Sequence, residues 1–397
     1  MKEKISIIAI ASISPLGSST NEIWEAYQNN AHYFSLEEQN GSLTWVAPLS
    51  KSSKSLLDEL RSSDSKYKKL DESVLYAMAA SRLAVTQSGW GNDSEFGINL
   101  GSSRGATRLF EQYHSEYLET GLASTLSSPT TTLGNISSWI SHDLGSTGPE
   151  ISHSITCSTG LHSILNGIAW INSGMADRFL VGGSEAPLTD FTIAQMKALK
   201  IYAKSEMVNR LQENDMSQNY PCQALNLDKE QNSMILGEAA SVACLERGAV
   251  KNALAVIEGI GYATEVLKHN TSISTDADCF QKSMRMALKN TDLDEVDAIV
   301  MHAPGTIKGD LSEYKAIRKV FGDKMPFLTT NKWKLGHTFA PSGMLNLEMA
   351  ILMIQHNQLI ASPFFKNQVT GKEVKKILVN AVGFGGNAVS VLIFKNE

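Results

Sequence analysis

Residues 151–164 read Ile-Ser-His-Ser-Ile-Thr-Cys-Ser-Thr-Gly-Leu-His-Ser-Ile, and this stretch decides the fold. Apolar and polar residues alternate from Ile151 to Thr156, which predicts a β-strand. After Cys157 come small residues, and apolar residues then recur at helical spacing up to Gly174. A thiol at such a strand-to-helix junction meets free backbone N–H groups and the positive end of a helix dipole, which lower its pKa and favour a nucleophilic thiolate. The alternative is an inert buried cysteine.

The composition is that of an ordinary globular protein. The 397 residues are 42% hydrophobic and 19% charged, with a length typical of two or three domain-sized units. A net charge of −6 argues against wholesale binding to nucleic acid or to a membrane surface. The four cysteines lack metal-ligand spacing and fit free thiols in a reducing cytoplasm: Cys157, Cys222, Cys244 and Cys279.

The first half of the chain begins with the apolar run Ile5–Ala11, which we interpret as a buried strand rather than a secretory signal. No apolar stretch reaches the length needed to span a bilayer. A helix is predicted from Asn21 and a long amphipathic helix over Glu72–Ser88, with a polar surface loop over residues 29–64 between them. A strand over Arg178–Glu185 follows the helix after Cys157.

A second half begins near Ala253 and repeats the pattern of the first. It contains four predicted strands and, after His337, an apolar helix from about Gly343 to Gln355; the strands are 254–262, 297–302, 327–331 and 376–386. Strands that alternate with helices favour a parallel α/β sheet, and helices apolar on all sides favour burial at the centre. We therefore expect two units, residues 1–250 and 251–397, whose central helices bring Cys157 and His337 together.

Three motifs follow Cys157-Ser-Thr-Gly160 along the chain: His302-Ala-Pro-Gly-Thr306 with Gly309, Asp310 and Glu313; Lys332 with Gly336-His337; and Gly383-Phe-Gly-Gly386. In this order they make the chain resemble the β-ketoacyl-acyl-carrier-protein synthases, the ketosynthases of the thiolase superfamily. The resemblance covers essentially the whole chain. It implies an α/β, thiolase-like fold of two duplicated five-layered α/β/α/β/α halves with buried central helices.

The resemblance also implies a decarboxylating Claisen condensation. Cys157 would carry the acyl group, and the backbone N–H groups of Cys157 and Phe384 would form the oxyanion hole. His302 and His337 would hydrogen-bond the malonyl thioester and its enolate, and Lys332 would tune the two imidazoles. Glu313 is expected to be structural.

The family further implies the substrates and partners. Substrates would arrive on the phosphopantetheine of an acyl carrier protein, with no metal or redox cofactor, and would contact Thr306, Gly385 and Gly386. Related enzymes place basic residues for the acidic carrier where this chain has Lys66, Lys68 and Lys69, although a solvated helix start would look the same. A cytoplasmic homodimer, or a heterodimer with a related subunit, is expected, with the strand Ile151–Thr156 at its interface.

Several positions depart from the family pattern. Ala303-Pro304 replaces Gly-Thr after the first histidine, Asn346 replaces a glutamate nine residues after the second, and Glu348 would face elsewhere on the helix. These departures favour a specialised, free-standing ketosynthase of fatty-acid-like, polyene or polyketide biosynthesis. Three alternatives stay open at this point: a chain-length-setting or weakly active partner subunit, a Cys/His hydrolase, and a thiolase-like enzyme that uses coenzyme A thioesters.

Overall fold

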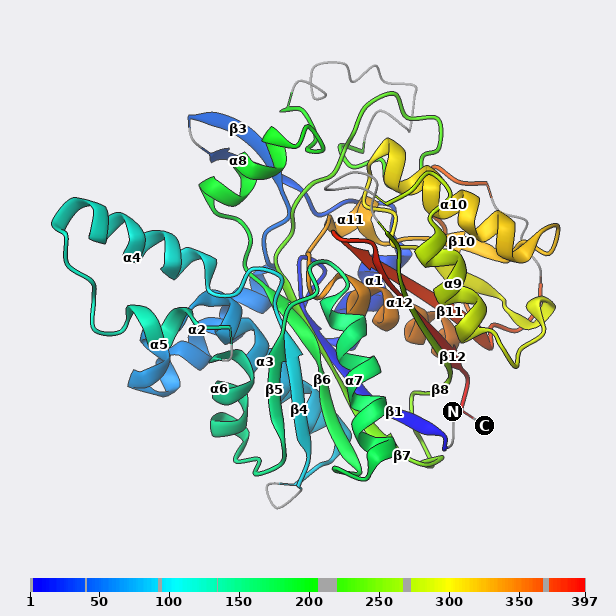
Figure 1. The fold of residues 1–397 in the computed structure, drawn as a ribbon, viewed down its shortest axis with the longest axis horizontal. Helices are drawn as coiled ribbons and strands as arrows, with labels where there is room; N and C mark the ends of the chain where they lie inside the picture. The colour runs from blue at the N-terminus through cyan, green and yellow to red at the C-terminus, as the bar shows by residue number, and fades with distance from the viewer. Residues whose placement is uncertain are drawn as a thin grey trace.

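A ten-stranded sheet runs through both halves of the chain in the order β10-β9-β11-β12-β8-β1-β7-β6-β4-β5 (Figure 1). The computed structural model describes residues 3–39, 41–91, 95–133, 135–205, 220–266, 273–366 and 371–396. The strands of the first half are β1 (Ile5–Ile13), β4 (Gly97–Gly101), β5 (Glu150–His153), β6 (Arg178–Glu185) and β7 (Ala239–Arg247). Those of the second half are β8 (Ala255–Thr264), β9 (Ala298–Val300), β10 (Phe327–Thr329), β11 (Lys376–Gly383) and β12 (Asn387–Phe394).

The two halves of the sheet have the same topology. From the outer edge inward, the strands of the first half lie in the order β5-β4-β6-β7-β1, and those of the second half in the order β10-β9-β11-β12-β8. When the five strands of each half are numbered along the chain, both orders read third, second, fourth, fifth, first. The halves join where β1 pairs with β8. This order confirms the duplication that the sequence indicates. The all-parallel sheet is wrong, however. Only the third, second and fourth strands of each half run parallel, whereas the fourth pairs antiparallel with the fifth, as does the fifth with the first.

Helices divide the protein into five layers. The helices α7 (Thr159–Ser173) and α12 (Ser342–His356) contact each other and strands of both halves, and their apolar side chains share one core with both. The helices α3 (Glu72–Ser88) and α6 (Asn135–Leu144) cover the outer face of the first half. The helices α9 (Asp278–Ala287) and α10 (Ile307–Phe321) cover that of the second.

The two central helices are not equally buried. In α12 every residue from Ser342 to Ile354 is buried, as its largely apolar sequence predicts. In α7 one face stays accessible, since Leu165 and Trp170 are half-buried and Ala169 is exposed. In one copy of the protein, the expectation that both central helices are buried on every side is therefore correct for α12 and wrong for α7.

The remaining elements lie around this core. The helix α1 (Thr20–Gln28) is capped by Ser19, and three short helices are α5 (Ser127–Thr131), α8 (Asp190–Ala198) and α11 (Lys332–Leu335). The helix α4 (Thr107–Thr120) projects from the body as an arm (Figure 1). The surface loop expected over residues 29–64 is wrong: the segment contains the hairpin β2 (Ser35–Gln39) and β3 (Ser42–Val46), and then the helix α2 (Lys51–Ser63). No helix of the described residues has the length and apolar character to span a membrane.

Candidate active site

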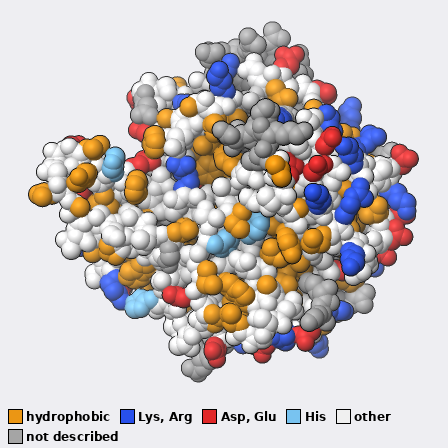
Figure 2. All heavy atoms as spheres, viewed as in Figure 1, with side chains coloured by type: hydrophobic (Ala, Val, Ile, Leu, Met, Phe, Trp, Pro, Cys, Tyr) orange, Lys and Arg blue, Asp and Glu red, His pale blue; other side chains and the backbone are white. Residues whose placement is uncertain are grey.

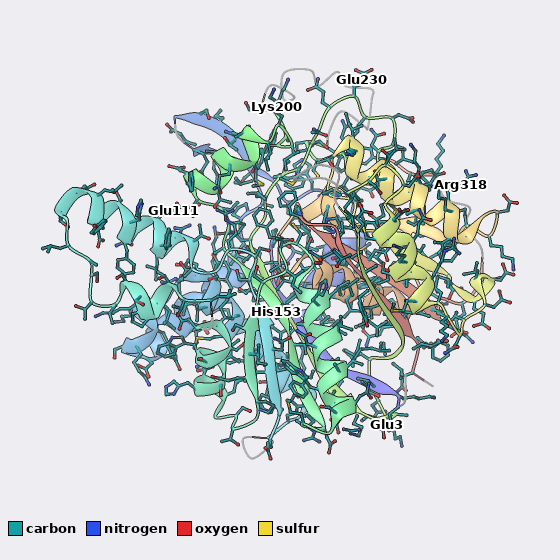
Figure 3. The ribbon with its side chains drawn as sticks, viewed as in Figure 1. Glu3, Glu111, His153, Lys200, Glu230 and Arg318 are labelled. Carbon is teal, nitrogen blue, oxygen red and sulfur yellow. The ribbon has the colours of Figure 1, made fainter. Side chains whose placement is uncertain are left out.

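The chain turns sharply before Cys157. The strand β5 ends at His153, earlier than the sequence predicts. Three residues later, Thr156 adopts a left-handed conformation with φ 48°, which a strand does not accommodate. The hydroxyl of Ser103 donates a 2.8 Å hydrogen bond to the carbonyl of Thr156 and supports this turn. His153, labelled beside α7 in Figure 3, places Nε2 3.1 Å from the carbonyl oxygen of Thr159. The nucleophile candidate therefore lies on a braced turn just before α7.

The glycine loop packs directly on this turn. A Cβ atom at Gly383 would lie 2.0 Å from Oγ1 of Thr156 and 2.7 Å from the carbonyl oxygen of Ile155, so this position has no room for a side chain. The close approach brings the next residue, Phe384, to the thiol. The backbone N–H groups of Cys157 and Phe384 lie close enough to the Cys157 sulfur to lower the pKa of its thiol. These are the two donors expected to form the oxyanion hole.

The pKa of the thiol differs from the prediction. Burial raises the pKa of Cys157 to about 12, and the nearby Glu185 carboxylate adds to the rise. Lys332 and the two backbone N–H groups lower the pKa but do not overcome burial. The expected lowering is therefore wrong, and Cys157 is a protonated thiol at neutral pH.

His302 follows β9 on a turn that Glu313 organises. The backbone N–H groups of His302 and Ala303 donate to the two carboxylate oxygens of Glu313, at 3.0 and 2.9 Å. Burial raises the pKa of Glu313 to about 7, which these donors oppose. The carboxyl group thus has the structural role expected of it. The ring nitrogen Nδ1 of His302 is buried and has no hydrogen-bond partner among the described residues.

The ring of His337 lies beside the ring of His302. The two ring centroids are 5.2 Å apart and the planes are nearly perpendicular. The backbone N–H of His337 donates to the carbonyl of Ile235 at 2.7 Å, and Gly336 before it has φ 77°. Burial, with Lys332 adding to it, lowers the pKa of both imidazoles well below the usual value. Both histidines are therefore neutral at physiological pH.

Lys332 is the charged group behind the two histidines. Its side chain is fully buried, and Nζ has no hydrogen-bond partner among the described residues. Burial lowers the pKa of the ammonium group to about 8, although Glu313 and Cys157 act in the opposite direction. Lys332 also lowers the pKa of His302 and His337, and so adds to the effect of burial that keeps both imidazoles neutral.

One cavity of about 310 Å³ joins these groups. Cys157, His302, His337, Phe384 and Thr306 all line it, and the rest of its wall is largely apolar. Among the apolar residues are Met196, Leu199, Ile201, Met234, Pro304 and Phe339. A single pocket with few polar groups that converge on a thiol is the usual form of a site for an apolar substrate.

Of the three residues expected to contact substrate, one lines the cavity and two do not. Thr306 lines the cavity, and its hydroxyl accepts a 3.1 Å hydrogen bond from the N–H of Gly309 as the N-cap of α10. Gly385 and Gly386 have φ of 96° and 71° in the turn between β11 and β12, and they are not among the residues that line the cavity. Their contact with substrate stays a prediction.

The structure shows the local surroundings of two positions that depart from the family pattern, Asn346 and Ala303, and of Glu348. Asn346 donates from Nδ2 to the carbonyl of Met301 at 3.0 Å, so its side chain supports the strand that leads to His302. Glu348 faces elsewhere, as the helical spacing predicts, and accepts a 2.7 Å hydrogen bond from Ser12. Ala303 takes up a positive φ of 27°, which the usual glycine would adopt more easily.

Two buried groups near the site carry no signal in the sequence. Glu185 accepts hydrogen bonds from the Ser102 hydroxyl and from the N–H of Ser103, at 2.8 and 2.7 Å. Lys229 forms a fully buried ion pair with Asp310 at 2.6 Å. Asp310 was a motif residue, but its partner comes from a polar stretch that looks like surface, so only the fold reveals the pair.

Lys66, Lys68 and Lys69 lie on the exposed side of a short 3-10 helix, Ser65–Lys69. Lys68 and Lys69 line a surface hollow of about 400 Å³ together with Arg61 and Arg108, whereas Lys66 pairs with Asp64 at 3.3 Å. Within the described ranges no group of three or more His, Cys, Asp or Glu side chains is placed to hold a metal ion. All four cysteines have free thiols and are buried.

Two family models together cover most of the chain. The model described as "Beta-ketoacyl synthase, N-terminal domain" matches residues 2–250, and "Beta-ketoacyl synthase, C-terminal domain" matches residues 254–365. The chain belongs to the β-ketoacyl synthase family. Curated relatives in this family include 3-oxoacyl-[acyl-carrier-protein] synthase 2 of Staphylococcus aureus (strain N315), which is 23% identical over 99% of this chain and 98% of the relative. The synthase 2 of Vibrio cholerae is 24% identical over 99% of each chain.

Solved structures of ketosynthases share the fold over the whole length of both chains. A β-ketoacyl synthase from Burkholderia phymatum superposes with a TM-score of 0.82 at 20% identity. The ishigamide ketosynthase/chain length factor gives 0.81 at 19% identity. A type II polyketide ketosynthase in complex with its acyl-carrier protein gives 0.82 at 18%. The thiolase-like fold implied by the four motifs is thereby confirmed.

Proposed function

We propose that this chain is a β-ketoacyl-acyl-carrier-protein synthase that joins an acyl group, carried on Cys157, to a malonyl-derived unit with loss of carbon dioxide. The observation that carries the proposal is the shared cavity, whose wall includes Cys157, His302 and His337. Two backbone N–H groups at the sulfur complete the set. Thiol, paired donors and two neutral imidazoles are the groups that this condensation needs.

The first step is acyl transfer. The sulfur of Cys157 attacks the carbonyl carbon of an acyl thioester, and the thiol proton leaves to a base. The N–H groups of Cys157 and Phe384 hold the oxyanion of the tetrahedral intermediate until the carrier thiolate departs and takes up a proton. Because burial keeps Cys157 protonated at rest, its proton is removed as the thioester is attacked. The neutral imidazole of His302 is a base within the same site.

The second step forms the carbon–carbon bond. The malonyl thioester loses carbon dioxide, and the electron pair of the broken bond becomes an enolate, whose oxygen His302 and His337 stabilise as N–H donors. The enolate carbon attacks the acyl carbonyl on Cys157, the C–S bond breaks, and the thiol is regenerated by protonation. Neutral imidazoles suit this role, because each ring has one N–H group that can donate a hydrogen bond to the enolate oxygen without giving up its hydrogen. Substrates bring all the atoms, so the reaction calls for no metal or redox cofactor.

The partners belong to the same proposal. The carrier protein docks at Lys66, Lys68 and Lys69, and its phosphopantetheine arm reaches the cavity past Thr306. The protein works as a dimer, either with itself or with a related subunit, in the cytoplasm. The presence of Cys157 and both histidines in one cavity favours the catalytic enzyme over the chain-length-setting subunit.

The proposal is tested by mixing the protein with an acyl-carrier protein and a malonyl-carrier protein and weighing the products. The expected product is a β-ketoacyl-carrier protein two carbons longer than the starter. The Cys157→Ala variant should form none and should carry no acyl adduct. An acyl adduct that persists in Cys157→Ala would overturn the assignment of the nucleophile.

A further inference from the structure

Ser342 is the one hydrogen-bond partner of the His337 ring within the described residues. Its Oγ lies 3.2 Å from Nδ1 of His337, and both side chains are buried. Ser342 is the first residue of α12, and its own backbone N–H donates to the carbonyl of Phe339 at 3.1 Å. The hydroxyl group is therefore held in place by the start of a fully buried helix.

Counting the hydrogen-bond donors and acceptors of His337 and Ser342 favours one position for the ring hydrogen of His337. A neutral imidazole has one N–H donor and one acceptor nitrogen, while a hydroxyl group has one hydrogen to donate. If Nδ1 of His337 carried the hydrogen, the hydroxyl hydrogen of Ser342 would have no acceptor among the described residues. If instead Ser342 donates to Nδ1, both groups are satisfied and the ring hydrogen lies on Nε2. Since a buried polar hydrogen without an acceptor is costly, the second arrangement is favoured.

We infer that Ser342 is a positioning residue that donates a hydrogen bond to Nδ1 of His337 and fixes the tautomer that presents Nε2–H to the catalytic cavity. This tautomer is the one that can donate to a thioester carbonyl and to the enolate, so the inference rests on the proposed function. His302 differs, because its Nδ1 has no partner in the described structure. A hydrogen bond thus determines which ring nitrogen of His337 carries the hydrogen, whereas no hydrogen bond among the described residues does so for His302.

The tautomer is measured by nitrogen NMR on wild-type protein with ¹⁵N-labelled histidine rings, with the His337 signals assigned from the His337→Gln variant. The expected spectrum shows a bare, hydrogen-bonded Nδ1 and a protonated Nε2. The Ser342→Ala variant should lose this bias, and Ser342→Thr should keep it. A wild-type spectrum with the hydrogen on Nδ1 would overturn the inference.

Kinetics give the second readout. Loss of one neutral hydrogen bond should lower kcat for carbon dioxide release in Ser342→Ala about three- to tenfold, with KM changed less than about twofold. Acyl loading of Cys157 should stay near wild type, and Ser342→Thr should restore kcat. The matched control is Thr338→Val, which removes a neighbouring buried hydroxyl that has no hydrogen-bond partner among the described residues. Equal kcat values in Ser342→Ala and wild type would contradict the inference.

The experiments distinguish a failure of the inference about Ser342 from a failure of the proposed function. If Ser342→Ala does not fold, the wild-type spectrum and Ser342→Thr still decide the tautomer. If the wild-type spectrum is as expected but the protein never releases carbon dioxide, the proposed function fails while the assignment of Ser342 stands.

Discussion

Gly383 and Thr156 touch so closely that a single methyl group does not fit between them: a Cβ at Gly383 would lie 2.0 Å from Oγ1 of Thr156. The contact joins the glycine loop, which carries one oxyanion donor, to the turn that carries the nucleophile. The two donors and the thiol are thus positioned by one contact between the halves of the chain.

Gly383→Ala should therefore misalign the oxyanion hole. The added methyl group would also lie 2.7 Å from the carbonyl of Ile155, and backbone there must shift. We expect acyl loading and turnover to fall about ten- to a hundredfold, since small displacements of catalytic groups have effects of that size. Gly371→Ala is the matched control, because a Cβ there meets no atom of the described residues within 4 Å. Equal loading rates in the two variants, measured by intact mass, would argue against the contact.

The pH dependence of Cys157 alkylation tests the state of the thiol. Because burial raises its pKa to about 12, the thiolate fraction should rise about tenfold for each pH unit between about pH 7 and 9. The rate of iodoacetamide labelling should follow that rise without levelling off, and Cys157→Ala identifies the signal. A plateau below about pH 8 would mean a lowered pKa, as the helix position alone suggests.

The carrier-docking surface is tested by charge reversal. Changing Lys66, Lys68 and Lys69 to glutamate should lower the association rate with carrier protein about tenfold or more at low ionic strength. Added salt should shrink the difference, because exposed charges are screened. Reversal of the exposed Lys251, Lys289 and Lys372 serves as the control. If both triple variants associate alike at low salt, the lysines near α3 are only a solvated surface.

The dimer should form through the edge strand β5 and the accessible face of α7. β5 ends the sheet, and Ile151 in it is 45% exposed. Figure 2 shows hydrophobic side chains gathered on the face where β5 and α7 lie in Figure 1. Ile151→Lys should weaken self-association in sedimentation runs. The control is Val266→Lys, since Val266 is 94% exposed. A stable, active monomer of the wild type would refute both the homodimer and the heterodimer.

Sequence patterns predicted the elements whose own residues determine them. The helix Glu72–Ser88 has the predicted bounds, because the Asp71 cap and the Gly89 end are local signals. The helix Lys51–Ser63 was missed, since its serines look like loop and only packing of Leu57 and Leu60 reveals it. The strand Ala239–Arg247 escaped notice for a similar reason, because it becomes a strand by pairing with β1 and β6.

Some features of the candidate active site could likewise be predicted from the sequence, and others could not. Cys157, His302 and His337 stand in motifs, so their convergence on one cavity follows from the duplicated order of elements, and Lys332 is buried behind the histidines. The pKa of Cys157 does not follow from its helix position, because it depends on burial, and burial depends on both halves of the chain. The apolar cavity wall has no sequence signal, since Met196 or Phe339 looks like any core residue.

The most direct test of the central claim compares acyl loading with the release of labelled carbon dioxide from malonyl-carrier protein. Wild-type protein should do both. His337→Ala should still load an acyl group on Cys157, because the oxyanion donors of that step are backbone N–H groups. Its carbon dioxide release should fall about a hundred- to a thousandfold, as for loss of a positioned catalytic donor. His302→Ala should show the same separation. Wild-type protein that loads acyl groups but never decarboxylates a malonyl thioester, alone or with a partner subunit, would contradict the assignment as a condensing enzyme.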